Sequence, residues 1–245
     1  MTTDYFARNE LAVETPQEVR HRQVWDLPVR LFHWALVAAV ISAFVTNRLG
    51  VAYFNYHVWS GYAVIVLVSF RILWGFVGTR HAKFWQFVRG PAATLRYAFG
   101  LLRGSTTPYA GHNPLGAYMV VILLIALGAQ AVFGLFGNDD IFNTGPLAGY
   151  VDKRLSLQLT SLHRHLFYWI AAATAIHILA VIAHHIFKRE NLILAMITGL
   201  KPHDSVPDGE IVHSSRTWLA ALLVVALAGA LWWIVAHAPI DDGSF

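Results

Sequence analysis

Long apolar runs, separated by polar stretches, dominate this chain. A helix needs about 20 consecutive apolar residues to cross the hydrocarbon core of a bilayer. Five runs reach that length, and they occupy about residues 27–46, 58–78, 115–136, 158–187 and 217–238. The pattern therefore predicts an all-α integral membrane protein, in which five helices form a transmembrane bundle surrounded by lipid.

The composition agrees with this prediction and limits the chemistry. Hydrophobic residues make up 56% of the 245 residues, charged residues make up 13%, and mean hydropathy is +0.50. The chain has no cysteine, which excludes disulfides, thiolate ligation of iron–sulfur clusters and a Cys-x-x-Cys-His haem attachment. It also lacks a Gly-rich phosphate loop and a basic stripe with interleaved aromatic residues, so nucleic-acid binding is not expected.

The positive charges between the runs predict the orientation, because Lys and Arg are enriched in short cytoplasmic loops. With the N-terminus inside, twelve of the 18 Lys and Arg residues fall on the cytoplasmic side and three on the outer side. We therefore expect a cytoplasmic N-terminus and a C-terminus in the outer compartment. Residues 81–105 are either an amphipathic segment on the inner membrane face or an ordinary basic loop. Residues 137–156 are expected to form a structured outer loop.

Histidine is unusually frequent for a membrane chain, with 13 histidines beside 14 carboxylates. Ionisable groups inside a membrane are costly and usually functional. His33 lies in the first predicted helix, His57 begins the second, and His163 and His177 lie on the fourth. The last two are fourteen residues apart, so they share a helix face to within about 40° and stand about 21 Å apart along the axis.

Antiparallel helices bring these histidines to two levels. The first helix starts inside, so His33 is expected at the inner level with His177, whereas His57 is expected at the outer level with His163. Two sites with two imidazoles each, one above the other across a bilayer, are typical of two b-type haems. Because both axial positions of each iron are then filled, oxygen has no place to bind, which favours electron transfer. Two alternatives stay open: the matching depths of the four histidines are accidental, or the histidines bind another metal. Zinc or copper, however, needs three or four ligands at one level, whereas these histidines separate into two levels.

Five motifs then point to a known family. They are VWDLPVRLFHW (24–34), HVWSGYAVIVLVSFRILWGFVG (57–78), FVRGP (87–91), GHNPLGA (111–117) and KRENLILAMITG (188–199). Over about residues 23–202 the chain resembles the bacterial cytochrome b561 and nickel–iron hydrogenase cytochrome b family. The resemblance implies a four-helix dihaem protein of the bacterial inner membrane that exchanges electrons with quinone and with a periplasmic partner, such as hydrogenase or a c-type cytochrome.

The resemblance also implies ligands and boundaries. It implies that His33, His57, His163 and His177 ligate two haem b groups. Residues 1–22 would be a cytoplasmic tail, 23–202 the dihaem cytochrome b domain, and 203–245 a linker with a fifth helix outside the four-helix core.

The run LHRHL (162–166) offers two histidines where one ligand is needed. His165 is twelve residues before His177 and so about 120° around the helix, which favours His163.

Three arginines are candidate partners of the haem propionates. Arg30 lies one turn before His33, Arg164 is beside His163, and Arg71, fourteen residues after His57, reaches the depth of the inner haem. For Arg71, extension to the cytoplasmic surface is an equal alternative. His112 either borders a quinone site or belongs to a helix-capping turn with Asn113, and His81 is expected in a solvated loop.

Three functions compete at this point. The leading one is an electron-transfer subunit that carries electrons between the quinone pool and a periplasmic redox partner. The second is a quinone-linked enzyme, a superoxide oxidase that passes electrons to quinone, as some relatives do. The third is a membrane protein that transports or senses metal ions through the same histidines.

Overall fold

The computed structural model describes residues 21–105 and 109–239. Five of its helices are long and apolar enough to cross a membrane. They are α1 (Leu27–Leu49), α2 (Phe54–Val77), α5 (Pro114–Leu135), α6 (Lys153–Lys188) and α8 (Thr217–Ala236). These bounds agree with the predicted runs to within about five residues, which confirms an all-α membrane bundle. The predicted tail, residues 1–22, lies almost entirely outside the described residues.

Side-chain caps explain where three of these helices begin. Asp26 accepts a hydrogen bond from the Val29 N–H at 2.7 Å at the start of α1, and Asp152 caps α6 in the same way. Asn113 accepts from the Gly116 N–H at 2.8 Å and precedes Pro114, the first residue of α5. An Asp or Asn cap satisfies an otherwise unpaired N–H, and Pro suits the first turn. The capping role expected for the turn at residues 112–113 is therefore confirmed.

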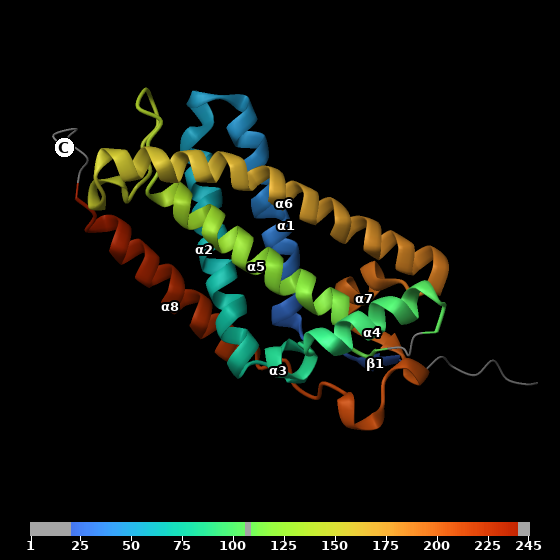
Figure 1. The fold of residues 1–245 in the computed structure, drawn as a ribbon. Helices are drawn as coiled ribbons and strands as arrows, with labels where there is room; N and C mark the ends of the chain where they lie inside the picture. Colours follow the sequence, from blue (N-terminus) through green and yellow to red (C-terminus); the bar gives the residue numbers. More distant parts are fainter. Residues whose placement is uncertain (1–20, 106–108, 240–245) are drawn as a thin grey trace, which may run out of the picture.

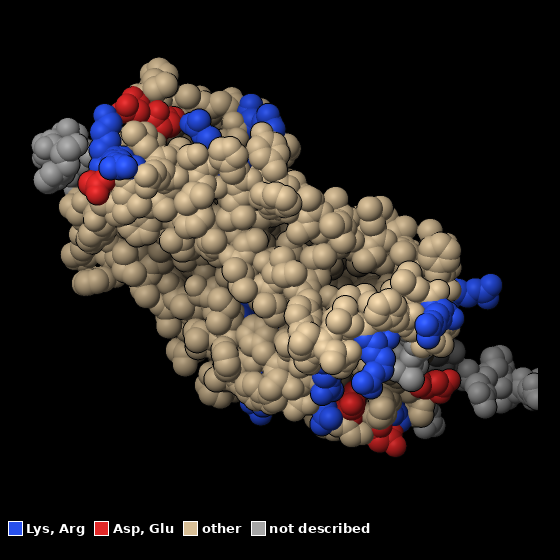
Figure 2. Space-filling view, viewed as in Figure 1, with Lys and Arg blue, Asp and Glu red and all other residues tan. Residues whose placement is uncertain are grey.

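Helix α2 lies at the centre of the bundle. It packs against α1, α5 and α8, and α5 packs in turn against α6. In contrast, α6 has at most marginal backbone contact with α1 and α2 (Figure 1). Charged side chains gather at the two ends of the molecule, and the broad middle of the visible face is almost entirely uncharged (Figure 2). That distribution is what a bilayer around the bundle requires.

One end of the bundle carries a small sheet, and we call it the sheet end. Strand β1 (His21–Gln23) pairs antiparallel with β2 (Leu200–Pro202). Around them lie the short helices α3 (Phe84–Phe87), α4 (Pro91–Leu102) and α7 (Leu192–Thr198), with the 3-10 turns η2 (Arg80–Ala82), η4 (His203–Ser205) and η5 (Asp208–Glu210). The basic segments around residues 79–113 and 188–216 thus lie together at the sheet end. That this end faces the cytoplasm stays a prediction.

His81 does not lie in a solvated loop, so that expectation was wrong. Its side chain is only 7% exposed, and its Nε2 donates to the Glu210 carbonyl oxygen at 2.7 Å. The chain between α7 and α8 folds back over η2, and this packing between distant segments buries the ring.

The opposite end carries the turn η1 (Val51–Tyr53) and the connection from α5 to α6, with η3 (Ala148–Tyr150), and we call it the loop end. The Asp139 carboxylate accepts hydrogen bonds from the N–H groups of Ile141, Phe142 and Asn143 at 2.9–3.0 Å. Burial alone would raise the pKa of this carboxyl, but the three backbone donors lower it to about 2. The connection is therefore structured, as expected.

Candidate functional site

The loop end of the bundle brings His57 of α2 and His163 of α6 close together. Their ring centroids are 6.0 Å apart, and the ring planes are nearly perpendicular at 84°. A metal–imidazole bond is about 2 Å long, so this separation has the size that two ligands on opposite sides of one metal atom require. Because the backbones of α6 and α2 are not closely packed, the two rings span the space between these helices.

Backbone carbonyls fix the orientation of both rings. His57 Nδ1 donates to the Ala43 carbonyl oxygen of α1, and His163 Nδ1 donates to the Gln130 carbonyl oxygen of α5, each at 2.8 Å. A carbonyl oxygen only accepts, so each Nδ1 must carry the proton and each Nε2 keeps its lone pair. This arrangement is typical of histidines that ligate a metal. Four helices therefore cooperate to present two free ring nitrogens.

Two glycines shape the space around this pair. A Cβ atom at Gly134 would lie 3.0 Å from Cε1 of His163, so only glycine lets the ring pack this closely on α5. Gly61, one turn after His57, has no atom within 4 Å of the position of an added Cβ. The wall beside His57 is thus flat and open, which suits a planar group held by that ring.

The other two histidines lie toward the sheet end. His33 of α1 and His177 of α6 are close enough to interact electrostatically, and the Phe32 ring meets the Phe70 ring of α2 at 6.4 Å. Among the described residues, the buried Nδ1 of His33 has no hydrogen-bond partner. The spacing of His163 and His177 on one helix separates the two pairs by about 21 Å.

The three arginines differ in their surroundings. Arg71 is 2% exposed and stacks against the Phe84 and Phe87 rings, so its side chain does not extend to the surface. Arg30 donates from NH1 to the Ile197 carbonyl oxygen at 2.6 Å. Within the described part of the chain, NH1 of Arg71 and Nε of Arg30 are buried without a partner. Arg164 is exposed on α6.

His112 lies beside the sheet-end pair. Its ring packs against Trp25 and Phe87 at centroid distances of 4.7 and 4.8 Å. Desolvation of the ring, followed by the nearby charges of Arg71 and Lys201, lowers the pKa of His112 to about 3. The adjoining cavity has a volume of only about 100 Å³, whereas ligand pockets usually measure about 300–1,000 Å³. The cavity therefore gives no support to quinone binding at His112.

Other histidines are engaged elsewhere. His165 is exposed and donates from Nδ1 to the Ser161 carbonyl oxygen of its own helix. His184 makes the same kind of bond to Ala180, and its Nε2 faces the Asn113 side-chain amide at 3.3 Å. In the described ranges, no three His, Cys, Asp or Glu side chains gather closely enough to hold a metal ion.

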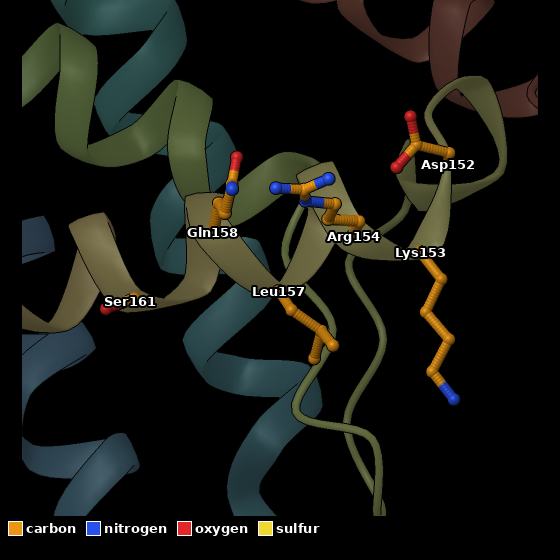
Figure 3. Close-up of a pocket in the computed structure, with 6 residues that line it drawn as sticks. All are labelled: Asp152, Lys153, Arg154, Leu157, Gln158 and Ser161. Atoms are coloured by element: carbon orange, nitrogen blue, oxygen red, sulfur yellow. The ribbon is translucent and has the colours of Figure 1, made fainter.

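A hollow of about 680 Å³ lies at the start of α6 (Figure 3). Its lining comes from Asp152, Lys153, Arg154, Leu157, Gln158 and Ser161. All six residues belong to the cap and first turns of one helix, and Lys153 forms an ion pair with Asp140 at 2.6 Å. The hollow is therefore an open surface feature and not an enclosed cofactor site.

Comparison with known proteins decides the family. A family model described as prokaryotic cytochrome b561 matches residues 24–199. The chain belongs to this family. It is a membrane cytochrome of the b type, which transfers electrons by means of haem b, as the resemblance of its motifs predicted. No solved structure matches the chain significantly.

Several curated relatives cover most of this cytochrome. A Rhodobacter capsulatus protein is 29% identical over 229 residues, which cover 76% of this chain and 84% of the relative. A Cupriavidus necator protein is 24% identical over 236 residues, with 81% and 94% covered. A Bradyrhizobium diazoefficiens protein is 27% identical over 208 residues, with 72% and 84% covered. Each relative is named "Probable Ni/Fe-hydrogenase B-type cytochrome subunit".

The residues of this cytochrome fit haem b. Neutral imidazole nitrogens are suitable axial ligands of haem iron, and His57 and His163 offer theirs across a gap of the right size. Toward the sheet end, nitrogens of Arg30 and Arg71 are donors without an acceptor among the described residues, which is the complement of the carboxylates at a haem edge.

Sequence reasoning missed one residue at this site, Asp26, which is 1% exposed. The run Asp-Leu-Pro before the first apolar segment signals a helix cap, but it does not reveal the burial.

Proposed function

We propose that this cytochrome holds two haem b groups and carries electrons between the two faces of a bacterial inner membrane. His57 and His163 would ligate the loop-end haem, and His33 and His177 the sheet-end haem. The observation that carries the proposal is the His57–His163 pair, whose ring centroids lie 6.0 Å apart with both Nδ1 atoms bonded to backbone carbonyls. Together with the His33–His177 pair toward the other end, it would provide two relay points across the bundle.

The protein side chains determine what such a centre does. A bound haem supplies an iron that accepts and releases one electron at a time. With two imidazoles held to each haem, these histidines would leave no iron position for oxygen and so would favour electron transfer. The carbonyls of Ala43 and Gln130 keep the loop-end rings in one tautomer and one orientation, and Arg30, Arg71 and Arg164 are the proposed partners of the haem carboxylates.

The physiological partners follow from the relatives. Those relatives are named as subunits of nickel–iron hydrogenases, so we propose that hydrogenase, or another periplasmic redox protein such as a c-type cytochrome, exchanges electrons at the loop end. Membrane quinone would exchange electrons with the other haem. Two electrons and two protons convert one quinone to quinol, so each quinone needs two successive one-electron transfers.

The orientation of this proposal rests on the charge asymmetry of the loops. The sheet end would face the cytoplasm, and the C-terminus would lie in the periplasm. A reporter enzyme that is active only in the periplasm, fused after residue 245, should be active. If only a cytoplasmic reporter is active at the same position, the loop-end haem would lie on the cytoplasmic side, opposite to the proposal.

The central test of the function uses the full-length holoprotein in liposomes. The vesicles enclose ferricyanide, dithionite is added outside, and both anions cross lipid poorly. Ferricyanide should bleach only when the protein is present, and His57→Ala and His33→Ala should each abolish the bleaching. A haem content of about one per chain, or equal bleaching by these variants and the wild type, would contradict the proposal.

The superoxide oxidase alternative has its own measurement. The oxidised protein is mixed either with superoxide or with a short-chain quinol, and the haem α-band is followed. An electron-transfer subunit should be reduced readily by the quinol and only slowly by superoxide. Rapid reduction by superoxide without a protein partner would favour the enzyme.

A further inference from the structure

Two opposite charges are buried together at the sheet end, Asp26 before α1 and Arg71 on α2. Asp26 is 1% exposed and Arg71 is 2% exposed. The Asp26 carboxylate accepts hydrogen bonds from the Val29 N–H at 2.7 Å, from Trp74 Nε1 at 3.1 Å and from the Thr79 hydroxyl. Burial of a charge is costly without partners, and Asp26 has three.

Arg71 is less well satisfied. Its guanidinium lies 5.2 and 5.8 Å from the centres of the Phe84 and Phe87 rings, and it interacts electrostatically with Asp26. Its NH1 has no hydrogen-bond partner in the described part of the chain. A buried, ionised donor without an acceptor is strongly unfavourable. The arrangement therefore points to an anionic acceptor that completes the site.

The position of Arg71 identifies that acceptor. The Phe87 ring contacts both Arg71 and His112, and His112 interacts electrostatically with both Arg71 and His177. The contact of Phe32 with Phe70 places the neighbouring residues, His33 and Arg71, at the same level of the bundle. Arg71 thus lies at the depth of the sheet-end histidine pair.

We infer that Arg71 donates its free NH1 to a carboxylate of the sheet-end haem, and that Arg71 and Asp26 together set the redox potential of that haem. This inference rests on the proposed dihaem function. Oxidised haem iron carries one more positive charge than reduced iron, so a nearby cation favours the reduced form and raises the midpoint potential, whereas a nearby anion lowers it. Asp26 acts as a compensating charge, and neither residue is a ligand of the iron.

The test is a potentiometric titration of the full-length holoprotein, followed at the α-band of each haem. Arg71→Gln should lower the sheet-end midpoint and Asp26→Asn should raise it, while the loop-end midpoint stays unchanged. Asp26→Asn keeps the helix cap, since Asn is as good a cap as Asp. Arg71→Lys retains the charge and should restore part of the shift. The His33→Ala variant, which should keep only the loop-end haem, identifies that haem's wave.

Two further variants complete the design. Arg154→Gln removes an exposed arginine of α6 and should move the sheet-end midpoint in neither direction. The double variant Asp26→Asn with Arg71→Gln has no unpaired buried charge, so it should fold even where a single variant does not. Its sheet-end midpoint should lie between those of the two single variants.

The possible outcomes separate the two proposals. A wild-type protein with one haem per chain would refute the dihaem function itself. If the wild-type protein holds two haems, three results would refute the inference alone. Arg71→Gln and Asp26→Asn could shift the sheet-end midpoint in the same direction, shift only the loop-end midpoint, or shift neither midpoint. For the double variant, any midpoint outside the interval of the single variants would refute it.

Discussion

The His57–His163 pair is oriented by backbone carbonyls, whereas the His33–His177 pair lies toward the end of the bundle that holds buried charged side chains. At the loop end, both Nδ1 atoms donate to carbonyl oxygens at 2.8 Å. At the sheet end, Nδ1 of His33 and nitrogens of Arg30, Arg71 and His112 are buried without partners among the described residues. The helices themselves thus orient the rings of the first site, whereas the second site has buried nitrogens that no described residue pairs with.

The two sites should therefore be sensitive to different kinds of substitution. Changes in helix packing should damage the loop-end site, because its rings are held by α1 and α5. Changes of charge should act on the sheet-end site, because its surroundings carry buried ionic groups. The predictions below separate these two modes, beginning with the largest effect.

The largest expected effect comes from Gly134→Val. A Cβ atom at this position would lie 3.0 Å from Cε1 and 3.2 Å from Nδ1 of His163, so the larger side chain should displace the imidazole. We expect complete loss of the loop-end haem and retention of the sheet-end haem, measured as half the haem per chain in a pyridine haemochrome assay.

A matched control is Gly229→Val on α8, where an added Cβ meets no atom within 4 Å. This variant should keep both haems. Equal haem content in the Gly134 variant and the wild type would show that the close packing of His163 on α5 is not required.

A smaller effect is expected from acid. The pKa of His112 is lowered to about 3, first by desolvation and then by the charge of Arg71. A histidine of the unfolded chain has a pKa near 6.5, so between about pH 6.5 and pH 3 the unfolded state takes up a proton that the folded state does not. Stability should therefore fall as the pH falls through this window.

Thermal unfolding in detergent at several pH values measures this loss. The melting temperature of His112→Gln should decline less between pH 7 and pH 5 than that of the wild type. His185→Gln, which changes an exposed histidine of α6, should behave as the wild type does. Parallel curves for all three proteins would exclude His112 as the source of the acid sensitivity.

The smallest expected effect concerns His165. This side chain is exposed and donates to the Ser161 carbonyl oxygen of its own helix, so His165→Ala should keep both haems and an unchanged α-band. Loss of the loop-end haem in this variant, with retention in His163→Ala, would reverse the choice made within LHRHL.

The sequence predicted the bundle because hydrophobic run length is a local property. The five runs became α1, α2, α5, α6 and α8, with ends within about five residues. Helical periodicity likewise placed His163 and His177 on one face at different depths. Both inferences depend only on spacing within one helix and on antiparallel neighbours.

Other features depend on contacts between distant segments, which spacing does not encode. The pairing of β1 with β2 joins residues about 180 positions apart, and the same closure of the chain buries His81. The burial of Asp26 requires Trp74 and Thr79 to converge on it from the end of α2. A carboxylate before a helix is recognisable as a cap from sequence, but its part in a buried charge pair is not.

The measurement that tests the central claim most directly is the spectrum of four single variants. His57→Ala and His163→Ala should each lose the loop-end haem and leave the same residual α-band and midpoint potential. His33→Ala and His177→Ala should each lose the sheet-end haem and leave the other residual spectrum. Loss of the same haem by the His57 and His33 variants would contradict the two-level arrangement on which this account rests.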